Sequence, residues 1–206
     1  MPSQYRNASQ RLNLMRKNIA SLAARIMAED GIADYGFAKR KAARQLGAPE
    51  TEALPTNAEI EAELRVYQSL YQGDEHKARL LELRTTALEV MRLLADFNPY
   101  LTGAVLNGTA GRFAEIEIEL FPDSAKDVEI SLLNRGIAFD QMEPRRNGGE
   151  VAEAILRFEW RECPVSLAIY APLAERSQRR GPHGGRPAER ARIGTVEALL
   201  AAEDGQ

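Results

Sequence analysis

Apolar residues in the first half of the chain recur at spacings of three and four, the period of one face of an α-helix. This pattern predicts four helices, over residues 14–27, 34–46, 57–71 and 80–97. Local signals support their ends: Gly47 follows the second helix, and Thr56 and Glu59 have the spacing of a capping box before the third. The fourth, which is the longest of the predicted helices, ends at Asn98-Pro99 because a residue before proline disfavours the helical conformation.

From residue 99 onward the pattern changes to an alternation of apolar and polar positions, which is typical of β-strands. Five strands are predicted, over residues 101–106, 115–121, 137–141, 154–160 and 164–170. The first two strands flank a glycine turn, and the last two are expected to form a hairpin. Two further helices are predicted, over residues 124–135 and 196–202.

These elements predict an α+β protein, in which a helical N-terminal domain precedes a small mixed β-sheet domain. We expect the helical domain at residues 1–97, with a basic first half, and the α/β core at residues 98–172. The remainder, residues 173–206, is an Arg/Gly/Pro-rich loop followed by a short C-terminal helix.

Composition narrows the class of protein. The 206 residues are 44% hydrophobic and carry a net charge of −3, which argues against a general nucleic-acid coat or a strong binder of membrane surfaces. Charge is uneven, since residues 1–47 hold nine basic and three acidic side chains. The single cysteine, Cys163, excludes an internal disulfide framework and fits a reducing compartment. No apolar run approaches the ~20 residues that a bilayer requires, so we expect a cytoplasmic protein without membrane contact.

A row of glutamates raises the question of function. In the predicted strand Glu115, Glu117 and Glu119 share one face, because successive side chains of a strand alternate. Like charges about 7 Å apart repel one another, so the row is either fully solvated or neutralised by something positive. A solvated row is a device that protects an edge strand from aggregation. A neutralised row is a candidate binding site.

The segment before this strand favours a nucleotide. A turn that contains Gly108, Thr109 and Gly111 lets backbone N–H groups approach a triphosphate closely, because glycine has no side chain. Two carboxylates on one side of the strand can hold Mg²⁺ against those phosphates. Arg112, within the turn, has the planar fork that suits a phosphate.

This pattern resembles the nucleotidyltransferase superfamily of DNA polymerase β, whose signature is an apolar residue, Gly and Gly/Ser, followed by an acidic-apolar-acidic strand. Here the matching residues are Leu106 to Thr109 for the turn and Glu115 to Ile118 for the strand. The resemblance covers residues 98–172. It implies catalytic and metal-binding roles for Glu115 and Glu117, Mg²⁺ or Mn²⁺ as cofactor, and a nucleoside triphosphate (NTP) as substrate. The family supplies a third carboxylate from a later strand, where this sequence has Ser166.

The alternative is a catalytically degenerate member of this fold that binds nucleic acid or protein. Its contacts would be an anion-binding cluster on the second helix (Lys39, Arg40, Lys41 and Arg44) and the arginines of the tail (Arg176, Arg179, Arg180, Arg186, Arg190 and Arg192). The same helix face is also compatible with plain solvation. A helix-turn-helix reader of DNA is disfavoured, because the helix that follows carries Glu59, Glu61 and Glu63. The expected partner is thus a nucleotide, with an RNA or a protein as acceptor, and the sequence does not indicate an oligomeric state.

Overall fold

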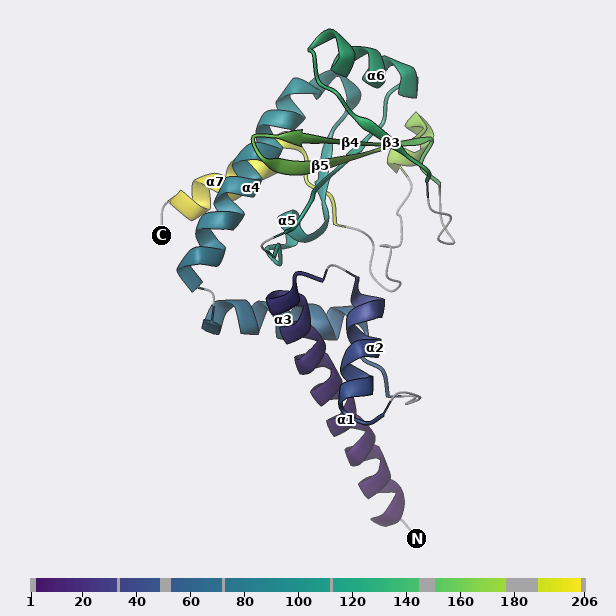
Figure 1. The fold of residues 1–206 in the computed structure, drawn as a ribbon, viewed down its shortest axis with the longest axis vertical. Helices are drawn as coiled ribbons and strands as arrows, with labels where there is room; N and C mark the ends of the chain where they lie inside the picture. Colours follow the sequence, from purple (N-terminus) through teal and green to yellow (C-terminus); the bar gives the residue numbers. More distant parts are fainter. Residues whose placement is uncertain are drawn as a thin grey trace. The chain divides into compact units, whose positions relative to one another are not determined.

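The computed structural model describes residues 3–32, 34–48, 53–71, 73–111, 113–144, 151–176 and 189–204. In this part of the chain seven α-helices accompany a five-stranded mixed sheet, which confirms the predicted α+β class (Figure 1). The chain divides into a helical unit, Met1–His76 with Gly111–Phe113, and a sheet unit, Lys77–Ala110 with Ala114–Gln206. The division falls earlier than the sequence-based boundary at residue 97, because the fourth helix packs into the core of the sheet unit.

The helical unit consists of three helices, α1 (Ser3–Asp30), α2 (Tyr35–Gln45) and α3 (Asn57–Tyr71). Their buried faces form one core, in which alanines of α1 and α2 allow close packing around Ile19 and Ile60. The prediction that the fourth helix is the longest was wrong. α1 has 28 residues and α4 (Gly73–Leu93) has 21, because the helical pattern of α1 continues to the N-terminal side of residue 14.

Side-chain caps define where the helices of this unit begin. Asp34 precedes α2 and its Oδ1 accepts a hydrogen bond from the Phe37 N–H at 2.9 Å. At the start of α3 the Thr56 N–H donates to Glu59 Oε2 at 2.6 Å, and the Glu59 N–H donates to Thr56 Oγ1 at 3.3 Å. This reciprocal pair is a capping box, as the sequence predicted.

The sheet unit is built on five strands in the order β1-β2-β5-β4-β3. Their bounds are β1 Tyr100–Thr102, β2 Ile116–Leu120, β3 Asp140–Met142, β4 Ala154–Trp160 and β5 Cys163–Ile169. Strands β2 and β5 pair in parallel, and the other neighbours pair antiparallel. The predicted hairpin of β4 and β5 is confirmed, and its turn consists of Arg161 and Glu162, both with positive φ.

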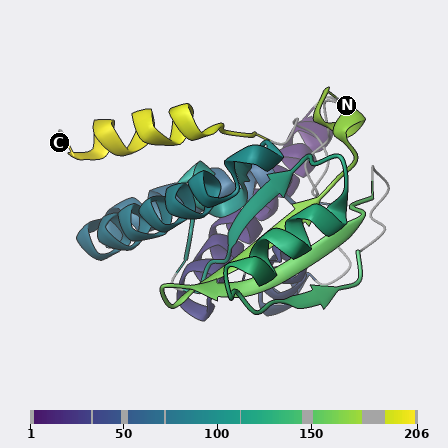
Figure 2. The same cartoon turned by 90° about the horizontal axis from the view of Figure 1, so that it is seen from above.

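Helices cover the apolar face of this sheet. The sheet unit contains α4, α5 (Gly103–Asn107), α6 (Ala125–Asn134) and α7 (Ile193–Asp204), with short 3-10 turns at Ala95–Phe97 and Pro172–Arg176. Helix α7 lies beside α4 (Figures 1 and 2), to which it is tied by ion pairs from Arg84 and Arg92. Buried side chains of α4 and α6 share one core with those of β2, β4 and β5. Because strand residues alternate, the opposite face of the sheet carries the polar side chains.

The predicted strand over residues 101–106 is wrong for most of its length. Strand β1 ends at Thr102, and the rest of the apolar run forms the short helix α5, which ends at the left-handed residue Gly108. Gly103 has a φ of +69° and breaks the extended chain. Asn107-Gly108 therefore ends a helix where a turn between two strands was expected, since a short apolar run does not distinguish a strand from a buried helix.

Candidate functional site

Polar side chains cross the whole sheet in one line. Pairing places Thr102 opposite Glu117, Glu117 opposite Ser166, Ser166 opposite Arg157, and Arg157 opposite Asp140. Residues that are directly opposite one another share a face of the sheet. We call this surface the polar face. In the line of paired residues Glu117 of β2 is negative and Arg157 of β4 is positive, and Ser166 lies where a third acid was expected.

Two arginines neutralise the ends of the glutamate row. Arg157 contacts Glu115 twice, from Nε to Oε1 at 3.1 Å and from Nη2 to Oε2 at 3.2 Å. Arg190 approaches Glu119 Oε2 to 2.8 Å through Nε. Because β2 is flanked by β1 and β5, it is not an edge strand, and edge protection does not explain the row.

Glu117, between them, is different. Within the described chain no hydrogen bond or ion pair to its carboxylate is present. The side chain is exposed, but the backbone of Gly103 and the surrounding sheet remove part of the water around its carboxyl group. This desolvation, and then the negative charges of Glu115 and Glu119, raise the pKa of Glu117, with Arg157 acting in the opposite direction. Among the described residues the Glu117 carboxylate therefore has neighbours of like charge and no direct ion-pair partner.

Gly103 brings the backbone against this carboxylate. A Cβ built on Gly103 would lie 2.8 Å from both Cδ and Oε1 of Glu117, so only glycine permits this approach without movement of the acid. Sequence reasoning missed Gly103, although a glycine inside a predicted strand was a usable signal for a break in the extended chain.

The predicted phosphate turn lies at the other end of α5. Gly108 ends α5, and the nearest atoms to its Cβ position are Arg84 Nη2 and Leu80 Cδ2 on α4. Thr109 is buried, and its N–H donates to the Ala104 carbonyl at 3.0 Å. The contacts given for Gly108 and Thr109 are with α4 and with Ala104, whereas Gly103 lies against the Glu117 carboxyl group.

The two remaining predicted residues of that turn are Gly111 and Arg112. Gly111 belongs to the helical unit, and its Cβ position has no neighbour within 4 Å. Arg112 lies outside the described residues.

Arg84 holds α5 in place. This arginine is buried on α4 and donates to the carbonyls of Val105 at 3.0 Å and Leu106 at 2.8 Å. It also pairs with Glu203 of α7. An arginine within the apolar stripe of the fourth predicted helix was a signal that sequence reasoning did not use.

The predicted anion-binding cluster is partly engaged in structural contacts within the helical unit. Lys39 Nζ donates to the Pro55 carbonyl at 2.8 Å and to Asn57 Oδ1 at 2.7 Å, and desolvation is the main cause that lowers its pKa. Lys41 pairs with Asp30 at 2.8 Å. The exposed cations of the cluster are Arg40 and Arg44.

Of the three described arginines of the predicted tail, Arg176 is exposed, and Arg190 and Arg192 have partners. Besides the contact with Glu119, Arg190 lies over the Phe121 ring, with 5.3 Å from Cζ to the ring centroid. Arg192 donates from Nε to Tyr100 Oη at 2.7 Å and pairs with Glu175 at 3.1 Å. Three others lie outside the described residues: Arg179, Arg180 and Arg186.

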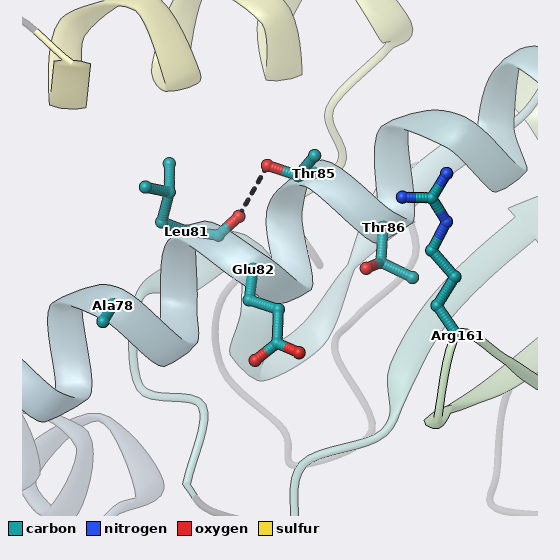
Figure 3. Close-up of a pocket in the computed structure, with 6 residues that line it drawn as sticks. All are labelled: Ala78, Leu81, Glu82, Thr85, Thr86 and Arg161. Atoms are coloured by element: carbon teal, nitrogen blue, oxygen red, sulfur yellow. Dashed lines mark hydrogen bonds between the residues drawn. The ribbon is translucent and has the colours of Figure 1, made fainter.

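Two further features of the described residues bear on the choice of site. Among the residues that the structure describes, no three His, Cys, Asp or Glu side chains are grouped as a metal cage requires. A shallow recess lies between α4 and the β4–β5 turn (Figure 3), and its lining consists of Ala78, Leu81, Glu82, Thr85, Thr86 and Arg161. It contains none of the predicted site residues.

Comparisons with known proteins do not assign a family. No protein-family model and no curated protein matches the chain. In the described chain, no helix combines the length and apolarity needed to cross a membrane.

Proposed function

We propose that the sheet unit is a nucleotidyltransferase-like domain that binds an NTP together with Mg²⁺ or Mn²⁺ on the polar face, beside Gly103 and Glu117. One observation carries this proposal: Gly103, at the start of α5, lies against the carboxylate of Glu117, for which the described residues supply no ion-pair partner. Phosphoryl and nucleotidyl transfer depend mainly on positioning and charge neutralisation, and this arrangement serves both.

The residues present fit a divalent cation of this type. Mg²⁺ and Mn²⁺ prefer carboxylate oxygens, and Glu115 and Glu117, on one side of β2, would hold the ion. When bound, the ion neutralises the phosphates of the nucleotide. The chain's own contribution is to keep the Glu117 carboxylate beside a backbone that has no side chain at residue 103, so that a phosphate can approach closely.

The test is a thermal-shift titration with ATP, CTP, GTP and UTP, each with and without Mg²⁺. A ligand that binds the native state raises the melting temperature by mass action. We expect a metal-dependent rise in the wild type that disappears when Glu115 and Glu117 are both changed to Gln. Glu129→Gln, on α6, is a control for loss of a carboxylate outside the proposed site. Absence of any nucleotide-dependent shift in a cooperatively melting protein would contradict the proposal.

A second candidate is a non-catalytic domain of the same fold that binds RNA or protein. It is favoured by one observation, that Arg157 and Arg190 already neutralise two of the three glutamates. In that case Arg40→Glu with Arg44→Glu weakens binding of a fluorescent single-stranded RNA, measured by anisotropy, whereas Glu117→Gln leaves it unchanged.

A further inference from the structure

The two arginines that neutralise the glutamate row are held very differently. The Arg190–Glu119 pair is enclosed, with both side chains 12% exposed, and Arg190 also donates to the Glu175 carbonyl at 3.3 Å. In the Arg157–Glu115 pair the side chains are 49% and 28% exposed. Exposed ion pairs contribute little to stability and are readily exchanged. Arg157 is therefore the arginine that can leave its glutamate.

The position of Arg157 gives it a second possible partner. Through the pairing with Ser166 it lies in the same cross-strand line as Glu117. Its guanidinium already contacts Glu115 through two nitrogens, and the same fork matches a pair of phosphate oxygens. No other cation of the described sheet strands lies in this line.

We propose that Arg157 is a nucleotide-binding residue that occupies Glu115 in the ligand-free protein and transfers to the phosphates when a metal–nucleotide complex binds. This inference rests on the proposed function. A divalent cation and a guanidinium at one carboxylate repel each other, so a metal that binds Glu115 displaces Arg157. Phosphates that arrive with the metal then give the displaced guanidinium a partner of opposite charge.

This exchange has a consequence that a purely structural ion pair does not have. Arg157 opposes binding of the metal alone, because it competes for Glu115, but it favours binding of the metal–nucleotide complex. Removal of its charge should therefore change the two affinities in opposite directions.

The experiment measures two affinities of the full-length chain. Free Mn²⁺ is followed by electron paramagnetic resonance without nucleotide, and ATP binding in saturating Mg²⁺ is followed by calorimetry. For Arg157→Gln we expect Mn²⁺ to bind roughly fivefold more tightly and ATP roughly fivefold more weakly, the effect of one exposed charge pair. Arg157→Lys keeps the positive charge but lacks the planar guanidinium. Its Mn²⁺ affinity should therefore be closer to the wild-type value than its ATP affinity is.

Two controls isolate the exchange. Arg161→Gln, in the turn of the same hairpin, removes an exposed arginine that pairs with Glu89 at 3.0 Å and should change neither affinity. In a Glu115→Gln background, Arg157→Gln should no longer tighten Mn²⁺ binding, because the competed carboxylate is absent.

The outcomes separate this inference from the proposed function. Changes of both affinities in the same direction, or no change in either, overturn the role of Arg157 while nucleotide binding stands. A wild type that binds no ATP contradicts the proposed function. If the wild type binds no ATP but Arg157→Gln binds Mn²⁺ more tightly than the wild type, competition at Glu115 is still supported. If neither the wild type nor Arg157→Gln binds Mn²⁺, the inference is overturned as well.

Discussion

Gly103 combines two constraints that can be separated by mutation. Its φ is +69°, and its Cβ position is 2.8 Å from the Glu117 carboxyl. Gly136 has a similar φ of +71° but no atom within 4 Å of its Cβ position. We predict that Gly136→Ala costs about 1 kcal/mol of unfolding free energy from backbone strain alone. Gly103→Ala should cost about as much, because the flexible Glu117 side chain can move, but unlike the control it should displace this carboxylate and weaken nucleotide binding.

Chemical denaturation and the nucleotide titration together check this prediction. ATP binding that is unaffected by either substitution would show that the contact with Glu117 has no consequence for the site.

Thr56 and Glu59 form a second local device, the capping box of α3. Thr56→Ala removes the acceptor of the Glu59 N–H, and we predict a loss of about 1 kcal/mol from the stability of the helical unit. Far-UV circular dichroism during urea unfolding measures this loss. Thr85→Ala, at an exposed position of α4 outside the helical unit, serves as the control.

The same box predicts a pH dependence. The hydrogen bond from the Thr56 backbone is the main cause that lowers the pKa of Glu59. A carboxyl whose folded pKa is lowered contributes stability above its unfolded pKa of about 4.3, and this contribution is lost as the pH falls through the folded value. The stability difference between wild type and Glu59→Gln should therefore shrink when the pH is lowered from about 7 to about 3. A constant difference would show that the charge of Glu59 is not involved.

Residues with local partners were predictable, and residues with distant partners were not. The capping box and the glutamate row follow from spacings within a few positions. Arg157, by contrast, meets Glu115 across 42 positions of sequence. Nothing local specifies that pair, because it depends on the order in which the strands assemble.

Helix α5 is the element on which the candidate site depends most, and Arg84 secures it. Arg84→Met leaves two α5 carbonyls and the Glu203 carboxylate without this donor. We predict a loss of about 3 kcal/mol and faster hydrogen exchange in residues 104–109. Arg92→Met is the matched control. Like Arg84, Arg92 links α4 to α7, but its pair with Glu197 is exposed. Arg92→Met should cost at most about 0.5 kcal/mol.

If the amides of α5 exchanged no faster in Arg84→Met than in Arg92→Met, the buried arginine would not be what holds this helix.

Helix α5 also shows a limit of prediction from sequence patterns. Long amphipathic helices such as α3 were predictable from their period, whereas the apolar run before Gly108 could be extended or helical. The left-handed conformation of Gly103 decided between them.

At the scale of the whole molecule, separate cores divide the chain. The sequence placed a boundary where the helical pattern ends, at residue 97. In the structure α4 contributes Leu83, Val90 and Met91 to the core of the sheet unit. The change of secondary structure and the division by packing fall at different residues, because periodicity does not reveal the partner of an apolar face.

We predict that the two units respond separately to core mutations. Ile60 is fully buried in the helical unit, and Ile60→Ala should destabilise that unit by about 3 kcal/mol. The chain has one tryptophan, Trp160, which packs against the core of the sheet unit. Urea unfolding should therefore show an earlier transition by circular dichroism in Ile60→Ala, with an unchanged midpoint of Trp160 fluorescence.

The reciprocal variant completes this test. Leu167→Ala removes a fully buried side chain of β5 and should lower the midpoint of Trp160 fluorescence directly. If Ile60→Ala moved the fluorescence midpoint as far as the dichroism midpoint, the two units would unfold as one cooperative body. Loss of the helical unit would then also remove nucleotide binding. With separate transitions, a protein whose helical unit has unfolded should keep the Mg²⁺-dependent response to ATP, because Gly103, Glu117 and Arg157 all belong to the sheet unit.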